Sequence, residues 1–114
     1  MTFIIVHCCE ELLFHTDFHP ALSGQAYTIL FPLQLVQTSP PEVVLQQDCT
    51  GKLHSFHYEK GCAFLWGPNT MHATAMVNYC DDAFRICISL SLGHITPMNV
   101  QLILQDISQQ YPPK

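Results

Sequence analysis

Two histidines and an aspartate are the residues of this chain whose types and spacing best suit chemistry. His15 and Asp17 are two residues apart, and on an extended strand residues with this spacing point to the same face. His72 follows a turn at residues 67–69 and can complete the set. Two imidazoles and one carboxylate leave open positions on a metal, an arrangement that suits non-haem Fe(II). Taken singly, each residue also fits an ordinary role at a strand end or near a turn.

Arg85 is a further candidate because it is one of four cationic residues and begins an otherwise apolar segment. The alternation of a strand places Arg85, Cys87 and Ser89 on one face. A buried guanidinium is costly unless it meets an anion, and its planar fork matches a carboxylate. The sequence therefore favours an anion-binding arginine, with an ion pair to Asp81 or Asp82 as the structural alternative.

In their order and spacing, these residues resemble the motif of the Fe(II)/2-oxoglutarate-dependent oxygenases. Between Asp17 and His72 lie 54 residues, and between His72 and Arg85 lie 12. The segment YEKGCAFLWGPNTMHAT is similar to the one that precedes the distal histidine in that family. The resemblance extends over about residues 12–92. It implies a double-stranded β-helix, the cupin-like jelly roll, in which His15, Asp17 and His72 hold iron.

The resemblance also implies an activity and a co-substrate site. Arg85 would bind the distal carboxylate of 2-oxoglutarate, and Tyr27 would donate a further hydrogen bond to it. Many members carry serine where this chain has Cys87, and Ser89 is the nearest serine on that face. The implied reaction is that of a dioxygenase, which hydroxylates a C–H bond and oxidatively decarboxylates 2-oxoglutarate. The substrate cannot be read from the sequence.

Three alternatives stay open. Members of this family have substantial structure before the first two ligands, where this chain has little, so a truncated oxygenase is one interpretation. A catalytically degenerate protein or a cupin-like module that binds a metal or ligand is another. A rival metal set consists of His57, Glu59 and His72, although Glu59 lies at a turn where a carboxylate is easily solvated. His19 is expected at the rim of the site.

The elements that must position these residues are short strands separated by turns, which is typical of an all-β sandwich or barrel. Residues 3–6 are one candidate strand. The other expected strands cover residues 12–18, 26–36, 42–47, 52–58, 62–66, 71–79 and 84–92.

A helix is expected after the strands. Thr96 fits its N-cap, and Pro97 fits its first position. The apolar residues at helical spacing are Val100, Ile103, Leu104 and Ile107. We expect one domain over residues 1–114, with a core at about 12–92 and this C-terminal helix at about 97–110.

Composition limits the classes of partner. Hydrophobic residues make up 48% of the chain and charged residues 11%, which is enough apolar material for one packed core. With four cations and a net charge of −5, binding to nucleic acid or to an anionic membrane is not expected. No apolar run approaches the roughly 18 residues of a membrane span. A homodimer, if formed, is expected to use an exposed barrel face or the C-terminal helix.

The six cysteines lack the spacing of a disulfide framework, because none forms a CxxC pair and Cys8 and Cys9 are adjacent. We therefore expect mostly buried, reduced thiols. The apolar start of the chain is short and has no basic leader, so a signal peptide is not expected. These features favour a cytoplasmic or nuclear protein.

Overall fold

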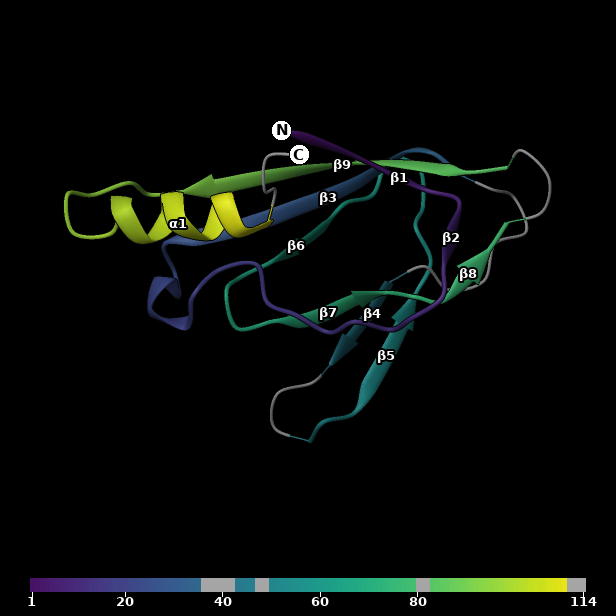
Figure 1. The fold of residues 1–114 in the computed structure, drawn as a ribbon, viewed down its shortest axis with the longest axis horizontal. Coiled ribbons are helices and arrows are strands. Elements are labelled where there is room, and N and C mark those ends of the chain that lie inside the picture. The colour runs from purple at the N-terminus through teal and green to yellow at the C-terminus, as the bar shows by residue number, and fades with distance from the viewer. Residues whose placement is uncertain (36–42, 47–49, 80–82, 111–114) are drawn as a thin grey trace.

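The computed structural model describes residues 1–35, 43–46, 50–79 and 83–110 and shows a mostly β-sheet chain with one C-terminal α-helix (Figure 1). A four-stranded sheet runs across the top of Figure 1, and a three-stranded sheet lies below it. The strand pairs are antiparallel. Over these described ranges, the sheets do not close into a barrel.

The sheets bring together strands that are distant in sequence. The four-stranded sheet has the order β1 (Thr2–Val6), β9 (Arg85–Gly93), β3 (Ala26–Gln34) and β6 (Phe64–Trp66). The three-stranded sheet has the order β5 (Leu53–Phe56), β4 (Val43–Gln46) and β7 (Met71–Thr74). A separate short pair consists of β2 (Cys8–Cys9) and β8 (Val77–Asn78).

The expected strand over residues 12–18 is wrong as a regular element. Its one pairing is a bridge in which the backbones of His15 and His72 exchange two hydrogen bonds of 3.0 Å. The chain then turns into a 3-10 helix, η1 (Pro20–Leu22), which the side chain of His19 caps. The ladder therefore ends after one residue pair, and that pair is the one that joins two candidate ligands.

The other expected strands overlap observed ones. Most of the observed strands are shorter, and residues 36, 42 and 47 lie outside the described part of the chain. Residues 71–79 divide into β7 and β8, because the chain leaves the three-stranded sheet after Thr74 to pair with the unexpected β2. The candidate at residues 3–6 is confirmed as β1, an edge strand paired with β9.

The expected C-terminal helix is confirmed as α1 (Val100–Gln110). The Thr96 hydroxyl accepts the N–H of Asn99 at 3.3 Å, and the Asn99 side chain accepts the N–H of Thr96 at 2.7 Å. This reciprocal cap satisfies two backbone donors at the start of the helix.

The expected packing face of α1 is wrong at one residue, Leu104. Ile103 is buried, but Leu104 is 53% exposed. Ile107 packs on the cluster that contains Ile103, as expected, and Leu102 takes the place of Leu104. Ile103 joins a cluster of residues from η1 and its surroundings, namely Phe18, Leu22 and Ala26. The helix therefore packs on the segment that directly follows Asp17.

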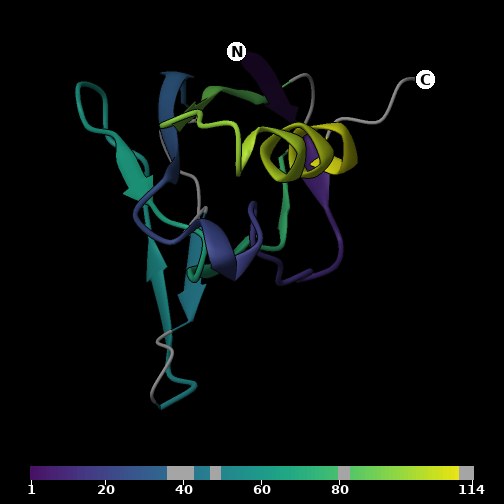
Figure 2. The ribbon, with the colours of Figure 1, turned by 90° about the vertical axis from the view of Figure 1, so that its left-hand side faces the viewer.

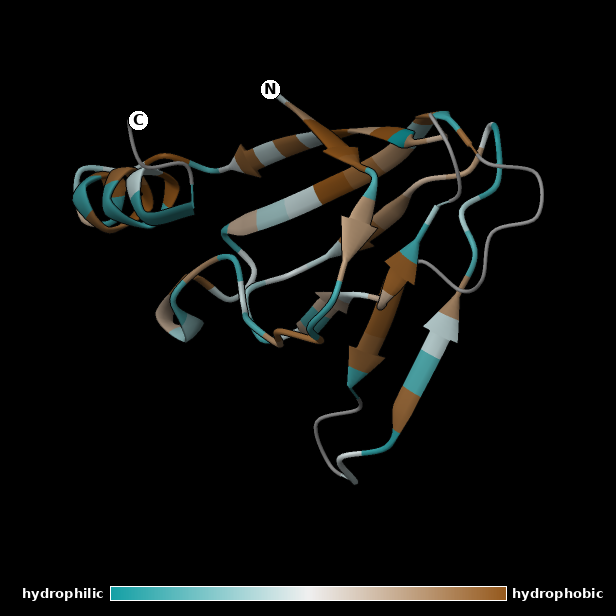
Figure 3. Cartoon of the chain, turned by 45° about the vertical axis from the view of Figure 1, so that its right-hand side comes forward, coloured by the Kyte–Doolittle hydropathy of each residue, from teal (hydrophilic) through white to brown (hydrophobic). Residues whose placement is uncertain are grey.

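A second cluster joins the two larger sheets. Its buried members are Leu30, Val43, Tyr58, Trp66 and Cys87. Leu30, Trp66 and Cys87 come from the four-stranded sheet and Val43 from the three-stranded sheet, while Tyr58 follows β5. Figure 3 shows bands of differing hydropathy along the strands of the four-stranded sheet.

The described cysteines are free thiols, but the expectation that most are buried is wrong for them. Cys87 is buried, Cys9 is partly exposed, and Cys8 and Cys62 are exposed. Cys8 is exposed because it lies on the short pair of β2 and β8, outside the two larger sheets. Within the described ranges, no helix has both the length and the apolar character needed to cross a membrane.

Candidate metal centre

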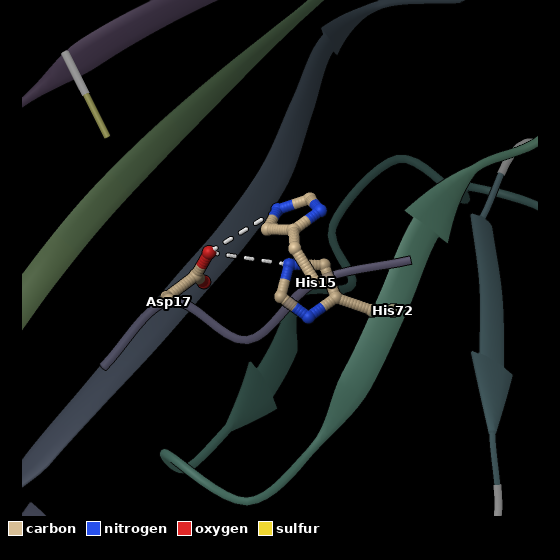
Figure 4. A group of neighbouring side chains, drawn as sticks. All are labelled: His15, Asp17 and His72. Carbon is tan, nitrogen blue, oxygen red and sulfur yellow. Dashed lines mark ion pairs between the residues drawn. The ribbon is translucent and has the colours of Figure 1, made fainter. Parts of the chain in front are cut away.

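His15, Asp17 and His72 come together as the sequence predicts (Figure 4). One ligand atom of each lies within 4.8 Å of the others. Oδ1 of Asp17 is 3.5 Å from Nε2 of His15 and 3.3 Å from Nε2 of His72. Atoms that each lie about 2.0–2.2 Å from one ion are at most about 4.4 Å apart. Both measured spacings therefore fit ligands of a single metal.

The two imidazoles are held so that the same ring nitrogen of each is free for a metal. Nδ1 of His15 lies 3.2 Å from the carbonyl oxygen of Leu13, and Nδ1 of His72 lies 3.0 Å from that of Thr70. Because a carbonyl can only accept, each Nδ1 carries the proton and donates it. In a neutral ring the lone pair is then on Nε2, the atom that faces Asp17. In a protonated ring Nε2 instead donates to Asp17, and a bound metal would take the place of that proton. Such backbone contacts typically orient metal-binding histidines.

The carboxylate of Asp17 is oriented by the four-stranded sheet. Its Oδ2 accepts the hydroxyl of Thr28 at 2.7 Å and the indole N–H of Trp66 at 2.8 Å. Thr28 and Trp66 lie directly opposite each other on β3 and β6. The backbone carbonyl of Asp17 also accepts a hydrogen bond from the side chain of Gln110 on α1. These contacts leave Oδ1 directed at the two imidazoles.

The electrostatics favour an ionised carboxylate. Burial alone raises the pKa of Asp17, but hydrogen bonds from His15, His72 and Thr28 lower it by more. The pKa of Asp17 therefore lies well below its ordinary value. The hydrogen bond to Asp17 in turn raises the pKa of His15 above 6.5, although burial opposes this.

Two hollows adjoin the candidate ligands, and His15 and Asp17 line both. The inner one, of about 370 Å³, extends between the sheets, where Thr28, Tyr58 and Ser89 line it together with all three ligands. The outer one, of about 420 Å³, lies beside α1, and its lining includes His15, Asp17 and the expected rim residue His19. The His15 side chain is 55% exposed and that of His72 is 8% exposed. The centre is therefore reached through the His15 side.

Arg85 is buried on the inner face of β9, as the alternation predicts, with Cys87 and Ser89. One of its terminal nitrogens, Nη1, donates to Sγ of Cys87 at 3.5 Å, and its guanidinium carbon lies 4.9 Å from the ring centroid of Tyr58. Nε and Nη2 are buried and have no hydrogen-bond partner among the described residues. Asp81 and Asp82, the expected alternative partners, lie outside those residues.

The position of Arg85 relative to the inner hollow differs from that of Ser89. Ser89 lines the hollow directly, whereas Arg85 does not. Tyr58 lines the hollow and also contacts the guanidinium. The structure therefore brings Ser89 to the site and places Arg85 behind a wall residue.

Tyr27 is not brought to the site. Its side chain is 38% exposed, and it lies on the face of β3 opposite to Thr28. The β3 residue that contacts Asp17 is Thr28, one position further along. The reason is the phase of the strand, since neighbouring residues point to opposite faces.

The rival metal set does not assemble. His57 and Glu59 are exposed, and among the described residues the one group with ligand atoms close enough for a metal is His15, Asp17 and His72. The sequence did not identify the contacts of Thr28 and Trp66 with Asp17. One feature of the sequence could have indicated the role of Thr28: it is a polar residue at a position of a mostly apolar strand where the alternation predicts burial.

The chain matches no family model, no curated protein and no solved structure. Function must therefore be inferred from its own side chains. One carboxylate and two imidazoles can bind a divalent transition metal and leave positions for further ligands, and hollows adjoin the group.

Proposed function

We propose that this protein is a non-haem Fe(II)- and 2-oxoglutarate-dependent dioxygenase that hydroxylates a C–H bond. The observation that carries the proposal is the ligand geometry at Asp17. Its Oδ1 faces Nε2 of both His15 and His72, while every other polar atom of the three side chains has a separate partner. This arrangement is a preformed two-histidine, one-carboxylate site.

The strand order supports a jelly roll of the double-stranded β-helix type. Counting the His15 segment as the second strand and omitting the short pair of β2 and β8, the four-stranded sheet has the order 1-8-3-6. The His15 bridge adds that segment beside β7, so the other sheet has the order 2-7-4-5. A chain that alternates between two facing sheets in this way forms the two Greek keys of a jelly roll.

The residues present fit the cofactor and the co-substrate. His15, Asp17 and His72 would hold Fe(II), and the inner hollow has the size of a small-molecule site, for which about 300–1,000 Å³ is usual. Ser89 would donate to a carboxylate in that hollow. Arg85 has two buried nitrogens, Nε and Nη2, that lack a described partner, and its guanidinium would supply the compensating charge. With Fe(II), 2-oxoglutarate and O2 bound, the site would supply an oxidant for a C–H bond: one oxygen atom of O2 would go to the hydroxyl group, and the other to the succinate that forms as 2-oxoglutarate loses carbon dioxide.

The protein's own part is to orient the ligands and to limit water. Thr28 and Trp66 fix the carboxylate, so that Oδ1 needs little rearrangement when a metal binds. The inner hollow is also lined by the apolar side chains of Leu30 and Val43. An apolar wall excludes water from one side of the metal and strengthens electrostatic contacts there.

The test is anaerobic binding of Fe(II) together with 2-oxoglutarate, followed by the weak visible charge-transfer band of that chelate. We expect the band in the parent protein and its loss in Asp17→Ala. Glu59→Ala removes an exposed carboxylate of the rival set and should retain the band. A folded parent protein without the band would contradict the proposal, and loss of the band in Glu59→Ala would favour the rival set.

A catalytically degenerate, cupin-like metal-binding module is the second candidate function. It is favoured by one observation, the placement of Arg85 against Cys87 and behind Tyr58 instead of at the surface of the hollow. Such a module would bind Fe(II) through the same three ligands without converting 2-oxoglutarate to succinate. Measurement of succinate in the presence of Fe(II) and oxygen distinguishes the two functions.

We also propose a cytoplasmic or nuclear location. Cys8 and Cys62 are exposed free thiols. Exposed free thiols persist in a reducing compartment, where disulfides are rare.

A further inference from the structure

The four-stranded sheet has an outer face that points away from the metal centre. Phe3 and Ile5 of β1, Tyr27 of β3, Leu65 of β6 and Leu92 of β9 lie on it, and their exposures range from 38% to 65%. These residues occupy the strand positions that alternate with the buried ones. We call this surface the outer sheet face.

Apolar side chains continue across the full width of the outer sheet face. In the centre, Ile88 of β9 lies opposite both Phe3 and Phe31. Further along, Leu90 lies opposite Ile29, which in turn lies opposite Leu65. The four strands carry one charged residue, Arg85, and its side chain is buried on the inner side. The outer sheet face therefore has neither charges nor a polar interruption in its central rows.

The other described elements lie on the opposite side of this sheet. α1 packs through Ile103 against Ala26, a buried residue of the inner side. Figures 1 and 2 show α1 and the three-stranded sheet on the same side of the four-stranded sheet. The exposures of Phe3, Ile5 and Leu65 agree with an uncovered surface. A continuous apolar surface of this kind typically marks an interaction site.

We propose that the outer sheet face binds a second copy of this chain, so that two four-stranded sheets pack face to face in a symmetric dimer. Two identical apolar faces are complementary to each other, as a two-fold axis requires. Each chain has a net charge of −5, and contact through an uncharged face avoids close approach of like charges. A partner recognised by charge or hydrogen bonds would find no matching group in the central rows.

The area of the outer sheet face can be compared with the area that a dimer interface buries. At about 4.8 Å between strands and about 3.3 Å per residue, the four strands cover roughly 400 Å² in projection, and protruding side chains make the accessible area larger. The apolar part of a homodimer interface is about 65% of roughly 800 Å² per partner. In projection the outer sheet face therefore covers about four fifths of the apolar area that a standard-size interface buries per partner.

The geometry of such a dimer is compatible with an open metal centre. Face-to-face sheets pack about 10 Å apart, and each hollow lies on the far side of its own sheet. Thr28 and Ser89 reach the inner hollow from the same strands whose other face would form the interface. Dimer formation would thus support β3 and β9 without covering the site.

The test is the mass of the full chain in solution, measured by sedimentation or light scattering. We expect a particle of twice the 12.9 kDa chain mass that dissociates on dilution. Ile88→Lys places an ammonium group at the centre of the face, opposite its symmetry mate. Since an unpaired buried charge costs about 3–5 kcal/mol, the dimer dissociation constant should rise on the order of 100-fold or more.

Two further variants keep the test decisive. Leu65→Lys changes a more exposed residue at the sheet edge and replaces Ile88→Lys if circular dichroism shows that the latter does not fold. Leu104→Lys introduces the same charge at an exposed apolar residue of α1 and should leave the dimer intact. A parent chain that stays monomeric up to about 100 μM would overturn the proposal. A dimer unaffected by the folded face variants, or lost in Leu104→Lys, would also overturn it.

Discussion

Asp17 is the residue on which the candidate metal centre depends, because its two carboxylate oxygens have separate partners. Oδ2 accepts from Thr28 and Trp66, and Oδ1 faces the two imidazoles. Without the contacts to Oδ2, the carboxylate could rotate or turn both oxygens toward His15 and His72. The hydrogen bonds from the sheet therefore convert a flexible side chain into a directed ligand.

Thr28→Val tests this directly, since it removes the hydroxyl and nearly conserves the shape. We expect Fe(II) affinity to fall about 10- to 100-fold, the usual effect of losing a contact that orients a metal ligand. Calorimetric titration under anaerobic conditions measures the change. Ser55→Ala removes an exposed hydroxyl on β5 and should leave the affinity unchanged. Equal affinities of Thr28→Val and the parent would show that the sheet does not orient Asp17.

The ligands themselves could be predicted from the sequence, because their chemistry is a property of residue type and of short spacing. The residues around them depend on strand phase and register. Tyr27 and Thr28 are adjacent, and the phase of β3 alone decides which of them points to the metal centre. Trp66 reaches Asp17 because β6 pairs with β3 at Thr28, and a pairing across 38 residues has no local signal.

At the scale of elements, α1 holds the segment that carries Asp17. Ile103 packs against Phe18, and Asp106 accepts the backbone N–H of His19 at 2.8 Å. Gln110 donates to the backbone carbonyl of Asp17 itself. The helix therefore replaces the missing strand ladder after His15, where the sheet pairing ends.

Ile103→Ala should loosen this support. Removing a buried isoleucine side chain typically costs about 2–5 kcal/mol, and the free energy of unfolding measured in urea should fall by that amount. We also expect weaker Fe(II) binding, because the cavity forms beside the segment that follows Asp17. Leu104→Ala on the exposed side should change the unfolding free energy by less than about 0.5 kcal/mol. Similar losses in both variants would contradict the assigned packing face of α1.

The elements were predictable where local patterns dominate. The Thr96 cap, the helix and the alternating strands β3 and β9 follow from short-range signals. Residues 12–18 have the composition of a strand, but their tertiary contacts allow only one residue pair. The expected strand therefore does not form. What ends that pairing is the turn at η1 and its packing under α1, which the segment's own residues do not specify.

At the scale of the whole molecule, polarity is distributed unusually between the two sides of the four-stranded sheet. Its inner side carries Arg85, Thr28 and Ser89, and its outer face is apolar. Two of the Arg85 nitrogens are buried with no partner among the described residues, and such groups are costly unless a ligand or another residue satisfies them. Burying an exposed apolar face against a partner is likewise favourable. Both features are consistent with a chain whose most stable form includes a bound ligand on one side and a second copy on the other.

Arg85 affects the stability of the whole molecule, because its Nε and Nη2 are buried without a described partner. Arg85→Met replaces the charge with an apolar side chain of similar length. Replacing a buried ion pair with apolar residues is typically neutral or stabilising by about 1–4 kcal/mol. Arg85 has no described carboxylate partner that the substitution would leave unpaired, so the ligand-free variant should unfold at the same or a higher temperature.

The same substitution should remove the stabilisation that 2-oxoglutarate gives the metal-loaded parent. A ligand at about 100 times its Kd contributes about 2.7 kcal/mol, which thermal unfolding with and without 2-oxoglutarate detects. Lys52→Met removes an exposed cation and should retain the full effect. If ligand-free Arg85→Met is instead destabilised by about 3–5 kcal/mol, Arg85 belongs to a structural ion pair such as one with Asp81 or Asp82. The anion-binding role would then be wrong, and the metal-binding module would be the better description of the protein.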